Sequence, residues 1–252
     1  MNEKLINTEK LPEVVKKVLL PYLEELLKIY EDNLLAIIIF GSATGKDFIP
    51  GSSDINLFLE FQKVDLAVLK KSLKLVAKGM RKKIVAPLFF TKEYMENSSD
   101  VFPIEFLEMA GNHLLLYGED PFVNLEINRE HLRLECEEQL RSKLIRLRQT
   151  YLEVGLQRRG LDRLLKDSLT SLIPVFRNIL HLKGKTIPHK KEEVLTGIGE
   201  EFGIDSATFL SIWQDKRDNN KIGREDAEVV FGRYIDELFK LTKSVDRINT
   251  SS

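Results

Sequence analysis

The chain has 252 residues and a mass of 29.1 kDa, a length that suits one or two domains. Its 38 Lys+Arg and 39 Asp+Glu give a formal net charge of -1, which argues against a dedicated duplex-DNA or tRNA binder, because such proteins usually carry a basic excess. Cys136 is the single cysteine, so an intrachain disulfide and a cysteine-based zinc site are excluded and a cytoplasmic location is favoured. No segment has the apolar length of a signal peptide or a membrane helix, so we expect no membrane association.

The first part of the chain shows patterns of both helix and strand. Apolar residues recur at helical spacing over residues 11–30, where Pro21 is expected to kink or divide the helix. The Ile-rich run 34–40 is too short for a typical helix and predicts a strand buried on both faces. A second strand is predicted over 55–61, and helical spacing returns over 66–80.

The remaining elements place a boundary near residue 125. Strands are predicted over 83–90 and 101–109, with a short helix over 92–97 between them. From about Arg129 the strand signal fades and long helical periodicity takes over, interrupted by a loop over 183–191. We therefore expect an α+β domain over residues 1–125, with a mixed sheet and flanking helices, and an all-α helical bundle over 126–252.

The stretch from Gly41 to Asn56 combines features of a phosphate and metal site. Gly41 and Ser42 end the first predicted strand, where a small turn lets phosphate oxygens approach backbone N–H groups and the serine adds a hydroxyl. After an eleven-residue insert, Asp54 and Asn56 stand two residues apart, so their side chains project from the same face of the second strand. Two oxygen ligands beside a phosphate cradle suit Mg²⁺ that bridges protein and nucleotide.

This stretch resembles the nucleotidyltransferase superfamily, which includes DNA polymerase beta, kanamycin nucleotidyltransferase and small antitoxin-type nucleotidyltransferases. In that pattern an apolar strand is followed by Gly-Ser or Gly-Gly, a loop of about this length and a second strand with two carboxylates at alternate positions. Gly41, Ser42 and Asp54 match the pattern, whereas Asn56 stands where the second carboxylate belongs. The resemblance covers residues 34–110.

The superfamily pattern also has a third carboxylate on a later strand. Glu105 is the candidate, because apolar residues precede and follow it, and Glu108 is the second choice. A helical half after a nucleotidyltransferase half is similar to the architecture of kanamycin nucleotidyltransferase. The resemblance thus implies a nucleotidyltransferase domain followed by a helical domain.

The activity that this resemblance implies is transfer of a nucleoside monophosphate from an NTP, with ATP favoured, to a hydroxyl of a small molecule or protein, with release of pyrophosphate. Gly41, Ser42 and Ser53 would bind the nucleotide. Asp54, Asn56 and Glu105 would hold Mg²⁺, and Asp54 and Glu105 would be the catalytic carboxylates. A nucleic-acid acceptor is not favoured, and a homodimer is left open.

Asn56 leaves a second interpretation open. An amide in place of a carboxylate removes one negative charge from a site that must hold Mg²⁺ against its hydration shell, so the affinity for the metal should fall. The alternative is therefore a catalytically impaired, nucleotide-binding or regulatory member of the same fold, similar to an antitoxin. The sequence does not decide between a working and an impaired enzyme.

Two further features belong to the helical half. Between Arg141 and Lys166 the sequence has eight basic residues and only two acidic ones. This excess indicates a surface that binds triphosphate or an anionic acceptor, or else a solvated helix face. We favour the solvated face. Arg177 and His181 resemble the Arg-x4-6-His motif of HEPN ribonuclease toxins, but only three residues separate them, so we expect a helix pair at the edge of the core. The eight basic residues are Arg141, Lys143, Arg146, Arg148, Arg158, Arg159, Arg163 and Lys166.

Overall fold

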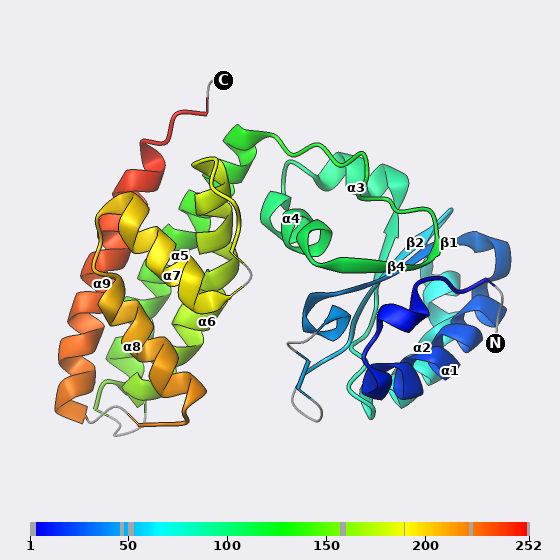
Figure 1. Ribbon diagram of the computed structural model, residues 1–252, viewed down its shortest axis with the longest axis horizontal. Helices are drawn as coiled ribbons and strands as arrows, with labels where there is room; N and C mark the ends of the chain where they lie inside the picture. Colours follow the sequence, from blue (N-terminus) through cyan, green and yellow to red (C-terminus); the bar gives the residue numbers. More distant parts are fainter. Residues whose placement is uncertain are drawn as a thin grey trace. The chain divides into compact units, whose positions relative to one another are not determined.

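The structure is a computed structural model that describes residues 4–45, 48–49, 53–156, 160–188, 190–221 and 224–250. The chain divides into two compact units, Met1–Glu126 and Ile127–Ser252 (Figure 1). Part of the predicted insert 43–53, and Arg158 and Arg159 of the basic stretch, lie outside the described residues. Each unit is described by itself below.

The first unit is built on a four-stranded mixed sheet in the order β3-β2-β1-β4 (Figure 1). β1 (Leu34–Phe40) is the predicted buried strand, and it pairs antiparallel with β2 (Asn56–Phe61) and with β4 (His113–Gly118). β2 pairs in parallel with β3 (Leu88–Thr91). β1 is apolar on both faces because it lies between β2 and β4, with helices over the sheet.

One face of the sheet packs against α1 (Glu13–Tyr30) and α2 (Leu66–Met80). α1 continues through Pro21, so of the two alternatives predicted there, a kink or a division, the division does not occur. The apolar stripe of α1 meets alternate residues of β1 and β2, which face this side because side chains along a strand alternate between its two faces. The buried residues of this cluster include Leu19, Leu23, Leu26, Ile37, Ile39, Leu57, Leu59 and Phe61.

The opposite face packs against aromatic residues of the following segments, which include α3 (Lys92–Ser98) and α4 (Pro103–Gly111). Phe58 of β2 stacks on Phe90 of β3 with ring centroids 4.9 Å apart, and Phe90 meets Phe106 of α4 at 5.8 Å. These contacts place α4 over the same face as the side chains of Phe58 and Asn56, two residues apart on β2.

The predicted strand over 101–109 is wrong, because this segment forms the helix α4. Pro103 occupies its first turn, a position that proline favours because its missing N–H is not needed there. The buried side chains of Pro103, Ile104, Phe106 and Met109 recur at helical spacing, a pattern that short apolar runs do not separate clearly from a strand. The fourth strand is instead β4, which the sequence analysis did not identify.

Short 3-10 turns connect several of these elements, namely η1 (Thr8–Lys10), η2 (Glu31–Asn33) and η3 (Gly41–Thr44). The second of them leads from α1 directly into β1. The third follows β1 and contains the Gly41-Ser42 pair, with Ala43 fully buried beneath it. The candidate nucleotide turn is therefore anchored to the core of the first unit.

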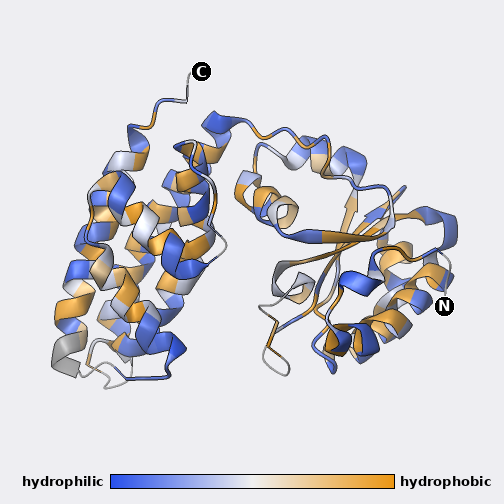
Figure 2. Ribbon diagram, in the orientation of Figure 1, coloured by the Kyte–Doolittle hydropathy of each residue, from blue (hydrophilic) through white to orange (hydrophobic). Residues whose placement is uncertain are grey.

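The second unit is all-helical in its described residues, with α5 (Arg129–Val154), α6 (Gly160–Leu182), α7 (Lys191–Phe202), α8 (Ser206–Arg217) and α9 (Arg224–Asp246) (Figure 1). Apolar residues lie along their mutually facing sides (Figure 2). Asn128 and Asp205 cap α5 and α8 by accepting hydrogen bonds from backbone N–H groups. Phe209 contacts both Phe176 and Tyr234 in the core. The α+β unit followed by a helical unit confirms the predicted fold class.

Candidate functional site

The turn after β1 brings Gly41 next to Asn56. The two residues flanking this point, Phe40 and Asn56, are partners in the β1–β2 register. Gly41 has a φ of 77°, the left-handed region that glycine adopts without penalty. A Cβ built on Gly41 would lie 3.6 Å from Nδ2 of Asn56. The sequence-predicted phosphate turn and the second-strand amide are thus direct neighbours.

Two polar residues hold the Gly41 turn in place. The backbone N–H of Gly41 donates to the carbonyl of Asn112 at 3.0 Å, and Nδ2 of Asn112 donates back to the carbonyl of Gly41 at 3.2 Å. The Thr44 hydroxyl lies 2.8 Å from the same carbonyl and 2.7 Å from Oδ1 of Asn112. Sequence reasoning missed Asn112 and Thr44, because Asn112 enters the site only through the pairing of β4 with β1.

The two predicted serines have different surroundings. Ser42 is half-buried, and no residue in the described part of the chain hydrogen-bonds to its hydroxyl. Ser53 closes the loop before β2, because its N–H donates to the carbonyl of Ile49 at 2.8 Å and its Oγ accepts from the N–H of Ile49 at 2.9 Å. Ser42 is therefore free to bind a ligand, whereas Ser53 also has a structural role.

A lysine, Lys83, lies beside Asp54. Nζ of Lys83 is 4.0 Å from Oδ1 of Asp54, and the two side chains are 54% and 55% exposed. The backbone fixes this approach, because the N–H of Ile55 donates to the carbonyl of Lys83 at 2.8 Å and Ile55 bridges to Ile84 in parallel. Lys83 itself has a positive φ of 65°. Lys83 is not among the site residues predicted from the sequence, where it is only the first residue of a predicted strand.

The sequence predicted Glu105 on a strand, but it lies in the first turn of the helix α4, where it is exposed. Its role as a third carboxylate stays a prediction. The strand beside β2 offers no replacement, because residues 84–91 contain no Asp or Glu, and neither does β4. Among the described residues, no group of three His, Cys, Asp or Glu side chains is arranged to hold a metal ion.

The residues around Asp54 can be compared with the ligands that a Mg²⁺ site requires. A magnesium site in a protein is built from oxygen ligands, usually carboxylates together with substrate phosphates. Here Asp54 is accompanied by the Asn56 amide and by an ammonium at 4.0 Å, which repels a divalent cation. The described residues therefore do not fit a resident Mg²⁺ site of the kind that the resemblance implies.

A histidine also lies in the same row of the sheet. Phe40 pairs with Asn56 on one side and with His113 on the other, so the three side chains project from one face. Nε2 of His113 lies 2.8 Å from Oδ2 of Asp120, and its Nδ1 lies 2.7 Å from the carbonyl of Ala110. This pair joins the start of β4 to the turn that follows it, and no sequence pattern predicts a contact between residues seven positions apart here.

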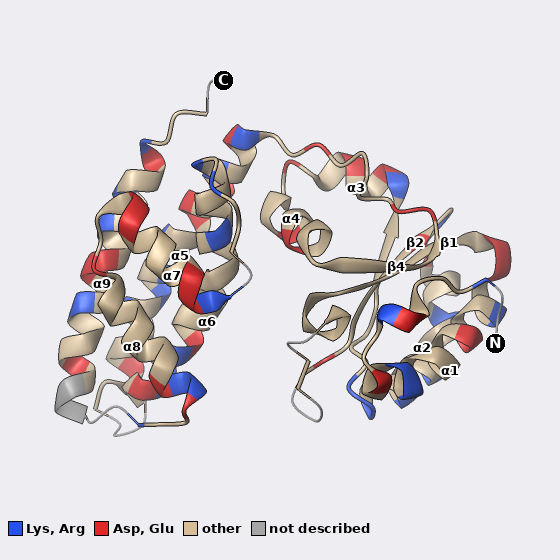
Figure 3. Cartoon of the chain, in the orientation of Figure 1, with Lys and Arg blue, Asp and Glu red and all other residues tan. Residues whose placement is uncertain are grey.

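Charge is distributed differently in the two units. In the first unit, β1 and β4 carry no charged side chain, and charge lies on the helices and turns (Figure 3). In the second unit, three of the six basic residues that the structure describes in the predicted basic stretch pair within their own helix. They are Arg141 with Glu137 at 2.7 Å, Arg163 with Asp167 at 3.3 Å and Lys166 with Asp162 at 2.6 Å. No described helix in either unit is long and apolar enough to cross a membrane.

Arg177 and His181 lie one turn apart on α6. Burial lowers the pKa of His181, and the nearby positive charge of Arg129 lowers this pKa further. The helix-pair interpretation of these two residues stays a prediction.

Comparisons with known proteins place the fold. Neither the family models nor the curated protein sequences contain a match to the chain. Among solved structures, the chain is similar to spectinomycin adenyltransferase AAD(9) from Enterococcus faecialis, crystallised with ATP and spectinomycin. The TM-score is 0.55 at 13% sequence identity, over 88% of this chain and 98% of that one. The comparison thus shows the fold, and the chain has the kanamycin nucleotidyltransferase-like fold.

Proposed function

We propose that the chain binds a nucleoside triphosphate, with ATP favoured, at the turn between β1 and β2 and transfers its nucleoside monophosphate to a hydroxyl of a small molecule or protein. The observation that carries this proposal is the anchored Gly41 turn beside Asn56, at the end of the β1–β2 pair in a fold of the nucleotidyltransferase type. The similar spectinomycin adenyltransferase was crystallised with ATP and spectinomycin, which supports a nucleotide and a small molecule as ligands here.

The roles follow from the chemistry of the residues at this turn. Phosphate oxygens would be held by backbone N–H groups of η3 and by the hydroxyl of Ser42. No described residue hydrogen-bonds to that hydroxyl. Lys83 would place a positive charge near the phosphates, where the superfamily pattern uses metal-bound carboxylates. The acceptor oxygen would form a bond to the α-phosphorus, the bond from that phosphorus to the bridging oxygen would break, and pyrophosphate would leave. Asp54 is the carboxylate at this turn that could take the proton of the acceptor hydroxyl.

A second function is favoured by a specific observation. The amide at Asn56, the absence of a carboxylate on β3 and β4, and the ammonium of Lys83 beside Asp54 all weaken the site for metal-assisted transfer. A nucleotide-binding regulatory protein of the same fold, without turnover, accounts for all three. In that case Lys83 would offset phosphate charge in binding alone.

Calorimetric titration with ATP and GTP, with and without Mg²⁺, followed by a pyrophosphate-release assay over a panel of hydroxyl compounds and proteins, separates these functions. Nucleotide binding with acceptor-dependent pyrophosphate release supports the transferase. Binding without release under any condition supports the regulatory protein. Failure to bind either nucleotide would overturn both. Ser42→Ala is the matched variant, because it removes one hydroxyl at the turn, and it should weaken binding without changing the fold.

A further inference from the structure

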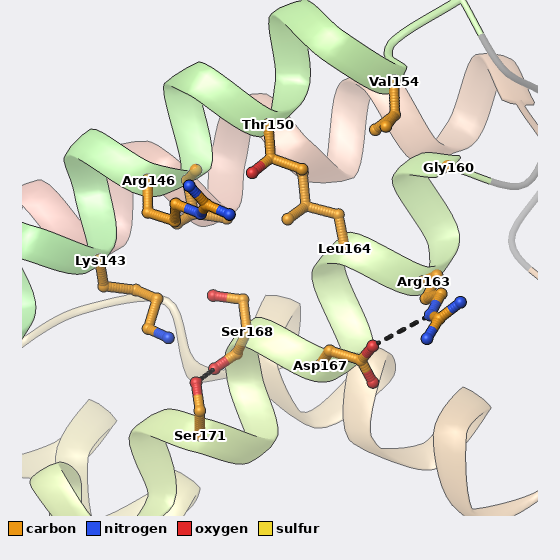
Figure 4. Close-up of a pocket in the computed structure, with 11 residues that line it drawn as sticks. Lys143, Arg146, Thr150, Val154, Gly160, Arg163, Leu164, Asp167, Ser168 and Ser171 are labelled. Carbon is orange, nitrogen blue, oxygen red and sulfur yellow. Dashed lines mark hydrogen bonds and ion pairs between the residues drawn. The ribbon is translucent and has the colours of Figure 1, made fainter.

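The helical unit contains a cavity of about 550 Å³ between one face of α5 and one face of α6 (Figure 4). This volume lies within the range of about 300–1,000 Å³ that is typical of small-molecule sites. The lining residues recur three or four positions apart on each helix, so each helix contributes a single face. They are Lys143, Arg146, Leu147, Thr150 and Val154 of α5 and Gly160, Arg163, Leu164, Asp167, Ser168 and Ser171 of α6.

Two cations of the α5 wall, Lys143 and Arg146, have no anionic partner among the residues that the structure describes. Elsewhere on α5, Arg133 and Arg141 both pair with Glu137, at 2.8 and 2.7 Å. By contrast, the described residues provide no ion pair or hydrogen bond to the side-chain nitrogens of Lys143 or Arg146. Like charges three residues apart on a helix repel each other, so an anion between these two side chains would remove an unfavourable interaction.

Lys143 is only half exposed, and its side chain reaches from α5 toward Ser168 and Ser171 of α6 (Figure 4). Burial lowers the pKa of Lys143, because desolvation disfavours its charged form. A bound anion would restore the solvation that the ammonium loses in the cavity. Lys143 is therefore oriented and partly dehydrated before any ligand binds.

The α6 wall adds hydroxyls without adding net charge. Asp167 is neutralised by Nε of Arg163 at 3.3 Å and by Nζ of Lys216 at 3.7 Å. Ser168 is buried, with its Oγ 3.0 Å from the Tyr234 hydroxyl, and the Ser171 hydroxyl donates to the carbonyl of Ser168 at 2.7 Å. The cavity thus combines an apolar lining, which includes Leu147 and Leu164, with polar oxygens and with two cations that form no ion pair with a described residue.

We propose that this cavity binds a small molecule that carries a phosphate group. The phosphate would lie between Lys143 and Arg146, and the apolar part of the molecule would lie against Leu147 and Leu164. A phosphate dianion matches the charge of these two cations. Nucleic acid fits less well, because the cavity is concave and the chain as a whole has a net charge of -1. The site lies wholly within the helical unit and is independent of the function proposed for the β1–β2 turn.

Isothermal titration of the full chain tests this proposal with AMP, inorganic phosphate and adenosine as probes. AMP and phosphate should bind and adenosine should not. Lys143→Gln and Arg146→Gln should each weaken AMP binding at least about tenfold, because each removes a charge-assisted hydrogen bond. Arg148→Gln is the matched control, since it removes one charge from α5 outside the cavity lining. Ser42→Ala separates the two sites, because it should leave binding in the cavity unchanged.

A spectroscopic readout makes the assignment independent of affinity. In protein with ¹³C-methylated lysines, the pKa of Lys143, measured by NMR, should rise when phosphate is added, because a bound anion favours the ammonium. The proposal is overturned if neither AMP nor phosphate binds, if Arg148→Gln weakens binding as much as Lys143→Gln does, or if Ser42→Ala alone abolishes it. Tighter binding of a single-stranded oligonucleotide without terminal phosphate would indicate a nucleic-acid surface and would also overturn it.

Discussion

Replacing Asn56 by Asp tests whether this amide is what excludes a metal from the nucleotide turn. The new carboxylate would lie two extended residues, roughly 6.6 Å, from Asp54. Coulomb repulsion at that distance is about 0.6 kcal/mol in water and about 2.5 kcal/mol at an effective dielectric of 20. Because Asp54 is 55% exposed, we expect the cost in the free energy of unfolding to be near the lower value. Without divalent cation, Asn56→Asp should therefore be slightly less stable than the wild type.

Addition of Mg²⁺ should reverse this difference. At a Mg²⁺ concentration ten times the dissociation constant, binding to the folded state adds about 1.4 kcal/mol, which corresponds to a rise in Tm of about 3–6 °C. The assay is thermal unfolding with EDTA and with increasing Mg²⁺, followed by pyrophosphate release with ATP. The double variant Asp54→Asn/Asn56→Asp keeps the charge of the wild type and should not gain this stabilisation. An equal Mg²⁺ response in the wild type, or none in Asn56→Asp, would refute the reasoning.

Three further predictions concern stability and reactivity. Gly118→Ala should lower the free energy of unfolding by more than about 3 kcal/mol, because its Cβ would lie 1.8 Å from the carbonyl oxygen of Leu35. Gly41→Ala has no contact closer than 3.6 Å and should cost only about 1–2 kcal/mol of backbone strain. Equal losses of stability for the two variants in urea denaturation would contradict this. Burial raises the pKa of Glu60, with Glu119 adding to the effect and Lys92 opposing it. The folded state then binds more protons than the unfolded state, so this contribution to stability is present below the unfolded pKa of about 4.5 and is lost as the pH rises through the folded pKa. Glu60→Gln should flatten that part of the profile of stability against pH and raise the stability at pH 7. An unchanged profile would contradict this prediction. Burial also raises the pKa of Cys136, so its fully buried thiol should react with a thiol reagent only after unfolding, and rapid labelling of the native protein would contradict its position in the core.

Much of the fold follows from local pattern. The run Leu34–Phe40 forms the predicted strand, and residues 66–80 form the predicted helix with the same ends. Both predictions succeed because burial on both faces of a strand and on one face of a helix imposes different periods on apolar residues. The strand predicted over 101–109 is wrong because the apolar residues of this segment fit both periods, and the segment forms a helix with Pro103 in its first turn.

The candidate site also contains residues that local sequence patterns predict and a residue that only the tertiary structure places there. Gly41, Ser42, Asp54 and Asn56 are close in the sequence and belong to one strand–turn–strand unit, so their spacing alone was enough to predict a site there, with Asp54 and Asn56 on one face of the second strand. Lys83 approaches Asp54 only because β3 joins the sheet in parallel beside β2. No local pattern carries that information, because the pairing of distant strands depends on the packing of the whole unit.

The sequence by itself therefore determined the order of most elements, the glycine turn and the amide at Asn56, since each is a property of residues within one short segment. Only the tertiary structure decided that Glu105 lies on a helix, that an ammonium rather than a carboxylate accompanies Asp54, and that Lys143 and Arg146 share a cavity. The physical reason is that charge and cavity depend on which side chains meet through space. Those contacts form between segments whose separation in the chain says nothing about their distance.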